Sequence, residues 1–167
     1  TCFPTSAAGS IAWWDMPAIE RQVASVAEME ALGAKLATQV GNARLVNIHG
    51  PLGAGKTTLV RGMLRGLGHA GAVKSPTFTL VEPYTFGHLR FYHFDLYRLN
   101  DPGELEFLGM RDYLDGNGVC VVEWAERAQG VLPSPDVDIM IEPTDTGRMV
   151  RIMTLTPQGD VLLKALT

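Results

Sequence analysis

The sequence is poor in cysteine and has no long hydrophobic run. Its 167 residues include only two cysteines, Cys2 and Cys120, which are far apart and lack the spacing of a metal-binding motif. So few cysteines are typical of a reducing compartment, and we therefore expect a cytoplasmic protein. No apolar stretch approaches the roughly 20 residues of a membrane-spanning helix, so no association with a membrane is expected.

Basic residues are also in the minority. Lys and Arg together number 14, against 18 Asp and Glu, which gives a net charge of −4. The basic residues are scattered along the chain, whereas a protein that binds nucleic acid by itself usually presents a basic face. This composition argues against a free-standing nucleic-acid-binding protein.

Repeats, low-complexity segments and a signal peptide are absent as well. Residues 1–17 have neither a basic n-region nor the sustained apolar stretch that signal peptides carry. We expect residues 1–18 to form a flexible N-terminal tail. A chain of this length suffices for one well-packed domain, so residues 19–167 are expected to form a single one.

Residues 50–58, Gly-Pro-Leu-Gly-Ala-Gly-Lys-Thr-Thr, are the most informative segment, because they fit the phosphate-binding P-loop pattern G-x-x-x-x-G-K-[ST]. Gly50 and Gly55 permit backbone conformations closed to residues with a Cβ atom, so the loop can surround a phosphate with its N–H groups. Lys56 supplies a positive charge for the β- and γ-phosphates, and the Thr57 hydroxyl is placed to ligate Mg²⁺. The residues expected to bind the phosphates of a nucleotide are Gly53, Ala54, Gly55, Lys56, Thr57 and Thr58.

The segments on either side of the loop support this interpretation. Residues 44–49 are mostly apolar and predict a short strand, and residues 58–67 predict a helix. A strand, a glycine-rich loop and a helix in this order are the context in which the P-loop pattern functions. The alternative is a glycine-rich surface turn that matches the pattern by chance. The helix residues expected on one buried side are Leu59, Val60, Met63, Leu64 and Leu67.

The remaining elements predict the fold class. Ser25 and Glu28 form a capping box that opens a helix after a strand over residues 19–24. Strands and helices alternate at first, and strands dominate later. This order predicts an α/β fold, a P-loop NTPase-like three-layer sandwich around a mixed, partly parallel sheet. The further elements expected are strands over residues 77–83, 89–95 and 119–122, a helix over residues 104–115, and a hairpin of residues 137–142 and 149–156.

A P-loop needs a second acidic group to hold or orient Mg²⁺. Glu123 follows the apolar strand 119–122 in the manner of a Walker B acid, and Asp95 ends the strand 89–95 in a similar way. Ligands of open α/β sheets bind at the carboxyl ends of the strands, so both acids are candidates for this role. The alternative for each acid is a solvated carboxylate at a strand end. The catalytic candidates are Lys56, Asp95 and Glu123.

Three further residues are candidates for coupling the nucleotide state to other parts of the protein. Ser75 and Thr77 flank a proline after the P-loop helix, and their hydroxyls could sense a γ-phosphate as a switch segment; an ordinary proline turn is the alternative. Trp124 follows Glu123 and could contact the nucleotide or a partner, or simply pack. His93 is interpreted as a structural strand residue, because nothing nearby in the sequence completes a triad or a metal site.

Four segments together resemble one known family. The glycine-rich loop and segments containing Ser-Pro-Thr-Phe, His-Phe-Asp-Leu-Tyr-Arg-Leu and Val-Glu-Trp-Ala-Glu-Arg occur in the order and spacing of the TsaE family, formerly called YjeE. The likeness extends over residues 19–155, and the second and third segments make it specific. The family often has Pro where Ala125 stands and an Asn-Glu-Tyr-like run where residues 82–84 stand. The four segments are residues 50–58, 73–80, 93–99 and 122–127.

The resemblance implies a small P-loop ATPase of the bacterial pathway that makes threonylcarbamoyladenosine in tRNA. In this family ATP binds the P-loop, and the matching positions assign Mg²⁺ to Thr57 and Glu123. Asp95 would be an acid of the catalytic site, and residues 75–77 would act as a switch.

The resemblance also implies partners. TsaB and TsaD are expected to act with the protein, and TsaD transfers the threonylcarbamoyl group to adenosine 37 of tRNA, which this chain would meet only through the complex. Hydrolysis would reset or drive the complex and would be slow without it. Two other classes of protein stay open. One is a small-molecule kinase, although the sequence has no Arg-rich lid. The other is a non-enzymatic, nucleotide-dependent assembly factor.

Overall fold

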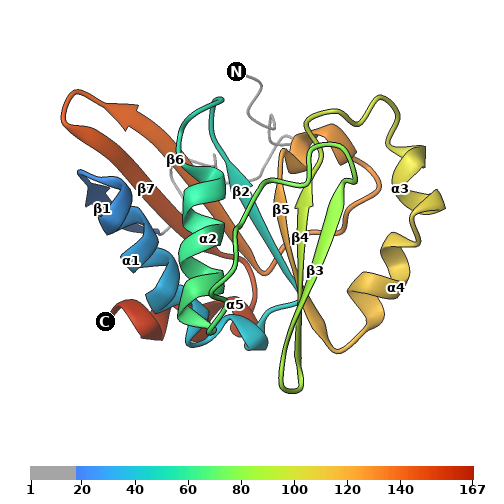
Figure 1. Cartoon of the computed structure of the whole chain (residues 1–167), viewed down its shortest axis with the longest axis horizontal. Helices are drawn as coiled ribbons and strands as arrows, with labels where there is room; N and C mark the ends of the chain where they lie inside the picture. Colours follow the sequence, from blue (N-terminus) through green and yellow to red (C-terminus); the bar gives the residue numbers. More distant parts are fainter. Residues whose placement is uncertain (1–17) are drawn as a thin grey trace, which may run out of the picture.

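All strands that the structure describes lie in one sheet. The computed structural model describes residues 18–167, so the tail expected over residues 1–18 lies outside it, apart from its last residue. The seven strands are ordered β1-β7-β6-β2-β5-β4-β3 (Figure 1). Their bounds are β1 (Ile19–Val23), β2 (Leu45–His49), β3 (Val81–Phe86), β4 (Leu89–Asp95), β5 (Gly118–Glu123), β6 (Val137–Thr144) and β7 (Gly147–Thr154).

Five α-helices occur among the described residues, and within that range none is long and apolar enough to cross a membrane. The helices are α1 (Val26–Ala37), α2 (Lys56–Gly66), α3 (Gly103–Phe107), α4 (Met110–Asp115) and α5 (Pro157–Leu163), with 3₁₀ turns η2 (Val40–Asn42), η3 (Ala125–Ala128) and η4 (Lys164–Leu166).

The sheet is parallel in its centre and antiparallel at both sides. Strands β6, β2, β5 and β4 form a parallel block. On one side β7 pairs antiparallel with β6, and β1 pairs antiparallel with β7. On the other side β3 pairs antiparallel with β4. This confirms the mixed, partly parallel sheet. Because the carboxyl ends of parallel strands meet at one edge, the P-loop after β2 comes together there with Asp95 of β4 and Glu123 of β5.

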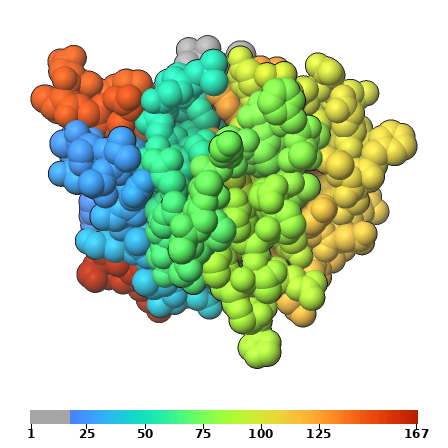
Figure 2. Space-filling view, viewed as in Figure 1, coloured from blue at the N-terminus to red at the C-terminus, as the bar shows by residue number. Residues whose placement is uncertain are grey.

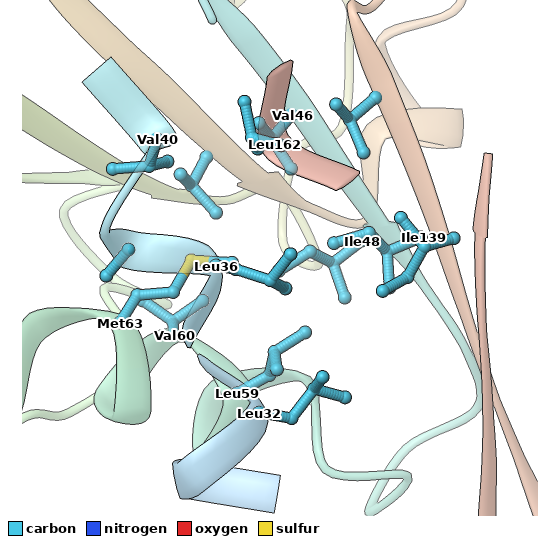
Figure 3. Close-up of a cluster of buried hydrophobic side chains, with 14 of the residues drawn as sticks. Leu32, Leu36, Val40, Val46, Ile48, Leu59, Val60, Met63, Ile139 and Leu162 are labelled. Atoms are coloured by element: carbon cyan, nitrogen blue, oxygen red, sulfur yellow. The ribbon is translucent and has the colours of Figure 1, made fainter. Parts of the chain in front are cut away.

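Two hydrophobic cores lie between the sheet and its two helical layers. Side chains alternate across the sheet, so Val46 and Ile48 of β2 enter the core shared with α1, α2 and α5, whereas Leu45 enters the core shared with α3 and α4. Figure 3 shows the first core, where Leu36 of α1 lies between Met63 of α2 and Ile48 in this view. The three layers are those that the sequence predicts.

Helix α2 is held against α1 by a close approach of the two backbones. A Cβ atom added at Gly33 of α1 would lie 2.3 Å from the carbonyl oxygen of Leu59, and one added at Gly62 of α2 would lie 2.2 Å from that of Glu30. Neither position has room for a side chain. Because α2 begins directly after the P-loop, this contact fixes the helix whose N-terminus faces the loop.

The capping box predicted at the start of α1 is present. The Ser25 hydroxyl accepts a hydrogen bond from the backbone N–H of Glu28 at 3.1 Å. The Glu28 carboxylate accepts one in return from the N–H of Ala24 at 2.7 Å, one residue before the usual partner. The strand predicted over residues 19–24 is β1.

Two predicted elements were wrong in part. The helix expected over residues 104–115 is divided into α3 and α4, because Gly109 adopts a φ of +75° between them. The strand expected over residues 77–83 begins only at Val81, since the preceding residues turn and Leu80 has a φ of +68°. Pro83 is tolerated within β3 because that strand lies at the edge of the sheet.

Helix α5 was not predicted, although the sequence carries its signals. The Thr156 hydroxyl accepts a hydrogen bond from the N–H of Gly159 at 3.1 Å, as an N-cap does, and Pro157 occupies the first helical turn. The strand expected over residues 149–156 therefore ends at Thr154. The other predicted strands and the P-loop helix are present, with ends shifted by at most two residues.

Candidate functional site

The P-loop forms an anion cradle between β2 and α2. Three of its glycines have positive φ angles, +152° at Gly50, +75° at Gly53 and +111° at Gly55. A Cβ atom at Gly50 would also lie 2.6 Å from the carbonyl oxygen of Ile141. The backbone N–H groups in the first turn of α2, from Lys56 onward, have no intrahelical acceptors, so they are free to bind an anion at the positive end of the helix dipole.

Lys56 is held by its own loop. Its side chain is buried, and Nζ donates to the carbonyl oxygens of Gly50 at 2.7 Å and Pro51 at 2.8 Å. The ammonium also lies 4.2 Å from the centroid of the Trp124 ring. Burial lowers the pKa of Lys56, which the negative charge of Glu123 and other acids nearby partly offsets. The positive charge of Lys56 is therefore already desolvated beside the P-loop.

Glu123 binds the P-loop threonine directly. It is buried at the end of β5, where its carboxylate accepts from Thr57 Oγ1, at 2.9 Å to Oε1 and 3.1 Å to Oε2. The imidazole of His93 contacts the same carboxylate, with Nε2 at 2.5 Å from Oε2. The predicted metal pair of Thr57 and Glu123 is thus brought together by elements far apart in sequence.

Asp95 lies beside Glu123 and holds the predicted switch segment. The two acids are register partners on the parallel strands β4 and β5. The Asp95 carboxylate accepts hydrogen bonds from the hydroxyls of Ser75 and Thr77, the latter at 3.3 Å, and from the N–H of Tyr97 at 2.9 Å. Ser75 also reaches Glu123 Oε2 at 3.4 Å. One serine hydroxyl therefore contacts both acids.

Trp124 connects the acid strand to the P-loop lysine. Directly after Glu123 its backbone turns with a φ of +61°, which a bulky residue rarely adopts. Its ring covers Lys56 and lies 5.0 Å from the ring of Tyr97. The candidate coupling residue thus touches the P-loop, in addition to packing.

Sequence reasoning missed two residues that contact this site. The sequence predicts a structural role for His93. Its position two residues before Asp95 on one strand nevertheless places both side chains on the same face of the sheet, and this spacing is a signal that could identify it. Arg148 carries no such signal. From the start of β7 it donates Nε to the carbonyl oxygen of Ala54 at 3.0 Å and Nη2 to that of Gly53 at 3.3 Å. It thereby supports the P-loop backbone from the hairpin.

A second charged cluster lies on the opposite face of the sheet, at the end of β2. His49 Nε2 lies 2.5 Å from Asp138 Oδ1, and Nδ1 lies 3.3 Å from Glu126 Oε2. Burial opposes the charge of His49, but the hydrogen bonds to the two carboxylates outweigh it and raise its pKa to about 9. Burial likewise opposes the charge of Glu126, and the bond to His49 leaves the pKa of Glu126 lowered. The cluster joins β2, β6 and η3.

An open cavity of about 310 Å³ adjoins the P-loop. In Figure 2 the three segments that line it meet where the orange hairpin turn, the blue start of α1 and the teal P-loop face one another. The lining residues are 23–26, Met29, 53–55, Thr58, Gly147 and Arg148.

These features place the chain in the class of P-loop α/β proteins. A P-loop joins a central strand to a helix, and two buried acids end the neighbouring parallel strands within reach of the Thr57 hydroxyl or of the Ser75 and Thr77 hydroxyls.

The family model described as threonylcarbamoyl adenosine biosynthesis protein TsaE matches residues 23–150, and the chain belongs to the TsaE family. The chain is 50% identical to the tRNA threonylcarbamoyladenosine biosynthesis protein TsaE of Haemophilus influenzae over 121 residues, which cover 72% of this chain and 77% of that protein. It is 42% identical to the protein of the same name from Bacillus subtilis over 116 residues, covering 70% and 71%. The crystal structure of Bacillus subtilis YdiB superposes with a TM-score of 0.76 at 29% identity, covering 90% of this chain and 94% of that one.

Proposed function

We propose that this protein is a magnesium-dependent ATPase that supports the threonylcarbamoyladenosine modification at position 37 of tRNA, acting with TsaB and TsaD in the cytoplasm. The observation that carries the proposal is the buried contact between Thr57 of the P-loop and Glu123, 2.9 Å apart. Membership of the TsaE family supports the pathway, and the names of two relatives specify tRNA.

The residues of the site fit ATP and Mg²⁺. The Thr57 hydroxyl and the Glu123 carboxylate offer the hard oxygen ligands that Mg²⁺ prefers. The N–H groups at the start of α2 and the Lys56 ammonium supply positive potential for the phosphates. Bound Mg²⁺ would neutralise the charge that develops on the phosphates during hydrolysis. The cavity beside the P-loop is available to the nucleoside part of ATP.

The protein's own groups would respond to a nucleotide in two places. Lys56 would exchange two neutral carbonyl partners and the Trp124 ring for phosphate oxygens, a gain for a charge that is already buried. Ser75 would exchange its contacts with Asp95 and Glu123 for contacts with the nucleotide. Both exchanges alter the segments around residue 75 and Trp124, which are our candidates for the surface that reports the nucleotide state to partners.

We expect the isolated ATPase to be slow. The arginines of the surrounding segments are engaged elsewhere, because Arg98 and Arg127 stack on the rings of Phe78 and Tyr97 and Arg148 bonds the P-loop carbonyls. A charge-stabilising arginine finger is worth about 10³–10⁵ in turnover. Its supply by a partner would make hydrolysis depend on the complex. The net charge of −4 agrees with tRNA being held by other subunits.

The experiment is ATP turnover by the purified protein, alone and then with a TsaB–TsaD pair. Slow turnover that the pair stimulates supports the proposal, whereas brisk partner-free turnover, on the order of the 10 s⁻¹ of a median enzyme, contradicts it. ATP binding without any turnover, with or without the pair, would instead favour a non-enzymatic assembly factor. Phosphate transfer to an acceptor in a small-molecule screen would favour a kinase.

A further inference from the structure

The buried imidazole of His93 binds the Glu123 carboxylate from the sheet. His93 is 0% exposed on β4, and its Nε2 lies 2.5 Å from Glu123 Oε2. Its other ring nitrogen, Nδ1, is buried and has no hydrogen-bond partner in the described part of the chain. Among the described residues, the contact with Glu123 is therefore the one hydrogen bond that the ring makes.

The contact with Glu123 places a proton on Nε2. If Nε2 carried no proton, two acceptors would face each other at 2.5 Å. His93 therefore donates Nε2–H to Glu123 Oε2.

His93 is the donor that ties Glu123 to the sheet. The carboxylate also accepts from Thr57 Oγ1, at 2.9 and 3.1 Å, and from Ser75 Oγ at 3.4 Å. Thr57 belongs to the P-loop helix and Ser75 to the switch segment, both of which would exchange contacts when a nucleotide binds. His93 belongs to β4, inside the parallel block of the sheet. Its bond can persist while the other two change.

We propose that His93 is a positioning residue for the metal site. By donating to Oε2 it holds the Glu123 carboxylate toward Thr57, so that metal-dependent nucleotide binding depends on a residue outside the P-loop and the acid strand. This inference rests on the proposed binding of ATP and Mg²⁺. Removing a residue that orients a metal ligand in this way typically lowers metal affinity 10–100-fold.

Three variants separate the donor from the packing of the ring. His93→Leu removes the donor and keeps an apolar side chain in the core, whereas His93→Gln keeps an N–H donor within reach of the Glu123 carboxylate. His88→Leu, in the exposed turn between β3 and β4, is the matched control. ADP affinity is measured by calorimetry, once with Mg²⁺ and once with a chelator, and the fold is followed by melting temperature.

We expect His93→Leu to lose about tenfold or more of the affinity that Mg²⁺ adds, with the affinity in chelator unchanged. His93→Gln should restore the Mg²⁺ effect to within about threefold, and His88→Leu should match the wild type. A Leu variant with the full Mg²⁺ effect, or a Gln variant as deficient as Leu, overturns the proposal. If His93→Leu does not fold, His93→Asn takes its place, since its shorter amide falls short of Oε2.

The tautomer is tested without any nucleotide. The ¹⁵N chemical shifts of the imidazole in the ligand-free protein should show a protonated Nε2 for His93. An unprotonated Nε2 overturns the proposal. If the wild type shows no Mg²⁺-dependent nucleotide binding at all, the proposed function fails, and the tautomer then decides the His93–Glu123 bond by itself.

Discussion

Two histidine–carboxylate pairs with the same separation lie on opposite faces of the sheet. His93 Nε2 lies 2.5 Å from Glu123 Oε2, and His49 Nε2 lies 2.5 Å from Asp138 Oδ1. The side chains of the first pair are 0% and 3% exposed, and those of the second are 19% and 15% exposed. The pairs therefore share one contact geometry and differ in their access to water.

The second ring nitrogen makes the difference between them. Nδ1 of His49 has the Glu126 carboxylate at 3.3 Å, whereas Nδ1 of His93 has no partner among residues 18–167. Acceptors at both nitrogens stabilise the imidazolium form, so His49 is a cationic clamp with a pKa of about 9, whereas among these residues His93 has an acceptor at Nε2 alone. A contact distance alone thus says little about what a histidine does; the groups around its other nitrogen decide it.

The largest effect should come from removing the charge of Glu123. Glu123→Gln keeps the size of the side chain and an oxygen acceptor for Thr57 and His93, but it removes the negative charge that we propose to bind Mg²⁺. We expect Mg²⁺-dependent turnover in the presence of partners to fall about 100-fold or more, as for other single preorganised electrostatic groups, with little change in melting temperature. Phosphate release measures this. Glu142→Gln, on the exposed end of β6, is the control. If Asp95→Asn alone lowers metal affinity, the assignment of the metal acid is wrong.

The next effect concerns the clamp and depends on pH. Because the folded pKa of His49, about 9, is above the unfolded value of 6.5, its stabilisation is fully present below pH 6.5 and is lost as pH rises through 9. Asp138 and Glu126 face the ring. Despite burial, the bond to His49 lowers the pKa of Glu126, and burial raises the pKa of Cys120 to about 12, so neither pKa falls within this range. We expect the free energy of unfolding to fall by on the order of 2 kcal/mol more in the wild type than in His49→Gln between pH 6.5 and 9.5. Urea denaturation at the two pH values measures this. Equal pH dependence in the two proteins would show that His49 is not charged in the fold.

Lys56→Ala should weaken nucleotide binding by at least about tenfold, or 1.4 kcal/mol. The variant removes the buried charge that faces the cradle and leaves the N–H groups of α2 in place, so binding should be weakened and not abolished. Calorimetry with ADP measures this, with Lys35→Ala on α1 as the matched control. Near-normal ATP binding and hydrolysis in Lys56→Ala would remove the basis of the P-loop assignment.

The sequence was sufficient for the parts of the site that are local or lie at strand ends. The P-loop spacing fixes the positions of Gly50, Gly55 and Lys56 within nine consecutive residues. Asp95 and Glu123 could be predicted because each ends an apolar strand, and parallel strands deliver their last residues to one edge. These inferences need a motif or a periodicity and no knowledge of which strands are neighbours.

The rest depended on tertiary placement. The contact of His93 with Glu123 requires that β4 and β5 be parallel neighbours in register, which no local pattern states. Arg148 reaches Ala54 only because the hairpin β6–β7 folds back beside the P-loop. Gly109 breaks a helical pattern through its own positive φ, and glycine within a predicted helix does not by itself show a break. Sequence periodicity identifies faces, and side-chain partners follow only once the sheet order is known.

The smallest expected effect separates the two carboxylates of the clamp. Glu126 lies farther from His49 than Asp138 does, 3.3 against 2.5 Å, and is 38% exposed against 15%. Solvent screens an exposed pair, so Glu126→Gln should cost only about 0.5 kcal/mol of stability, whereas Asp138→Asn should cost more and lower the pKa of His49 further. An NMR titration of the His49 ring in both variants measures the two contributions directly. A larger fall of the His49 pKa in Glu126→Gln than in Asp138→Asn would mean that Glu126 of η3, and not the shorter bond to Asp138 of β6, keeps this histidine protonated. In that case the partner of the second ring nitrogen would by itself explain why the two histidines differ.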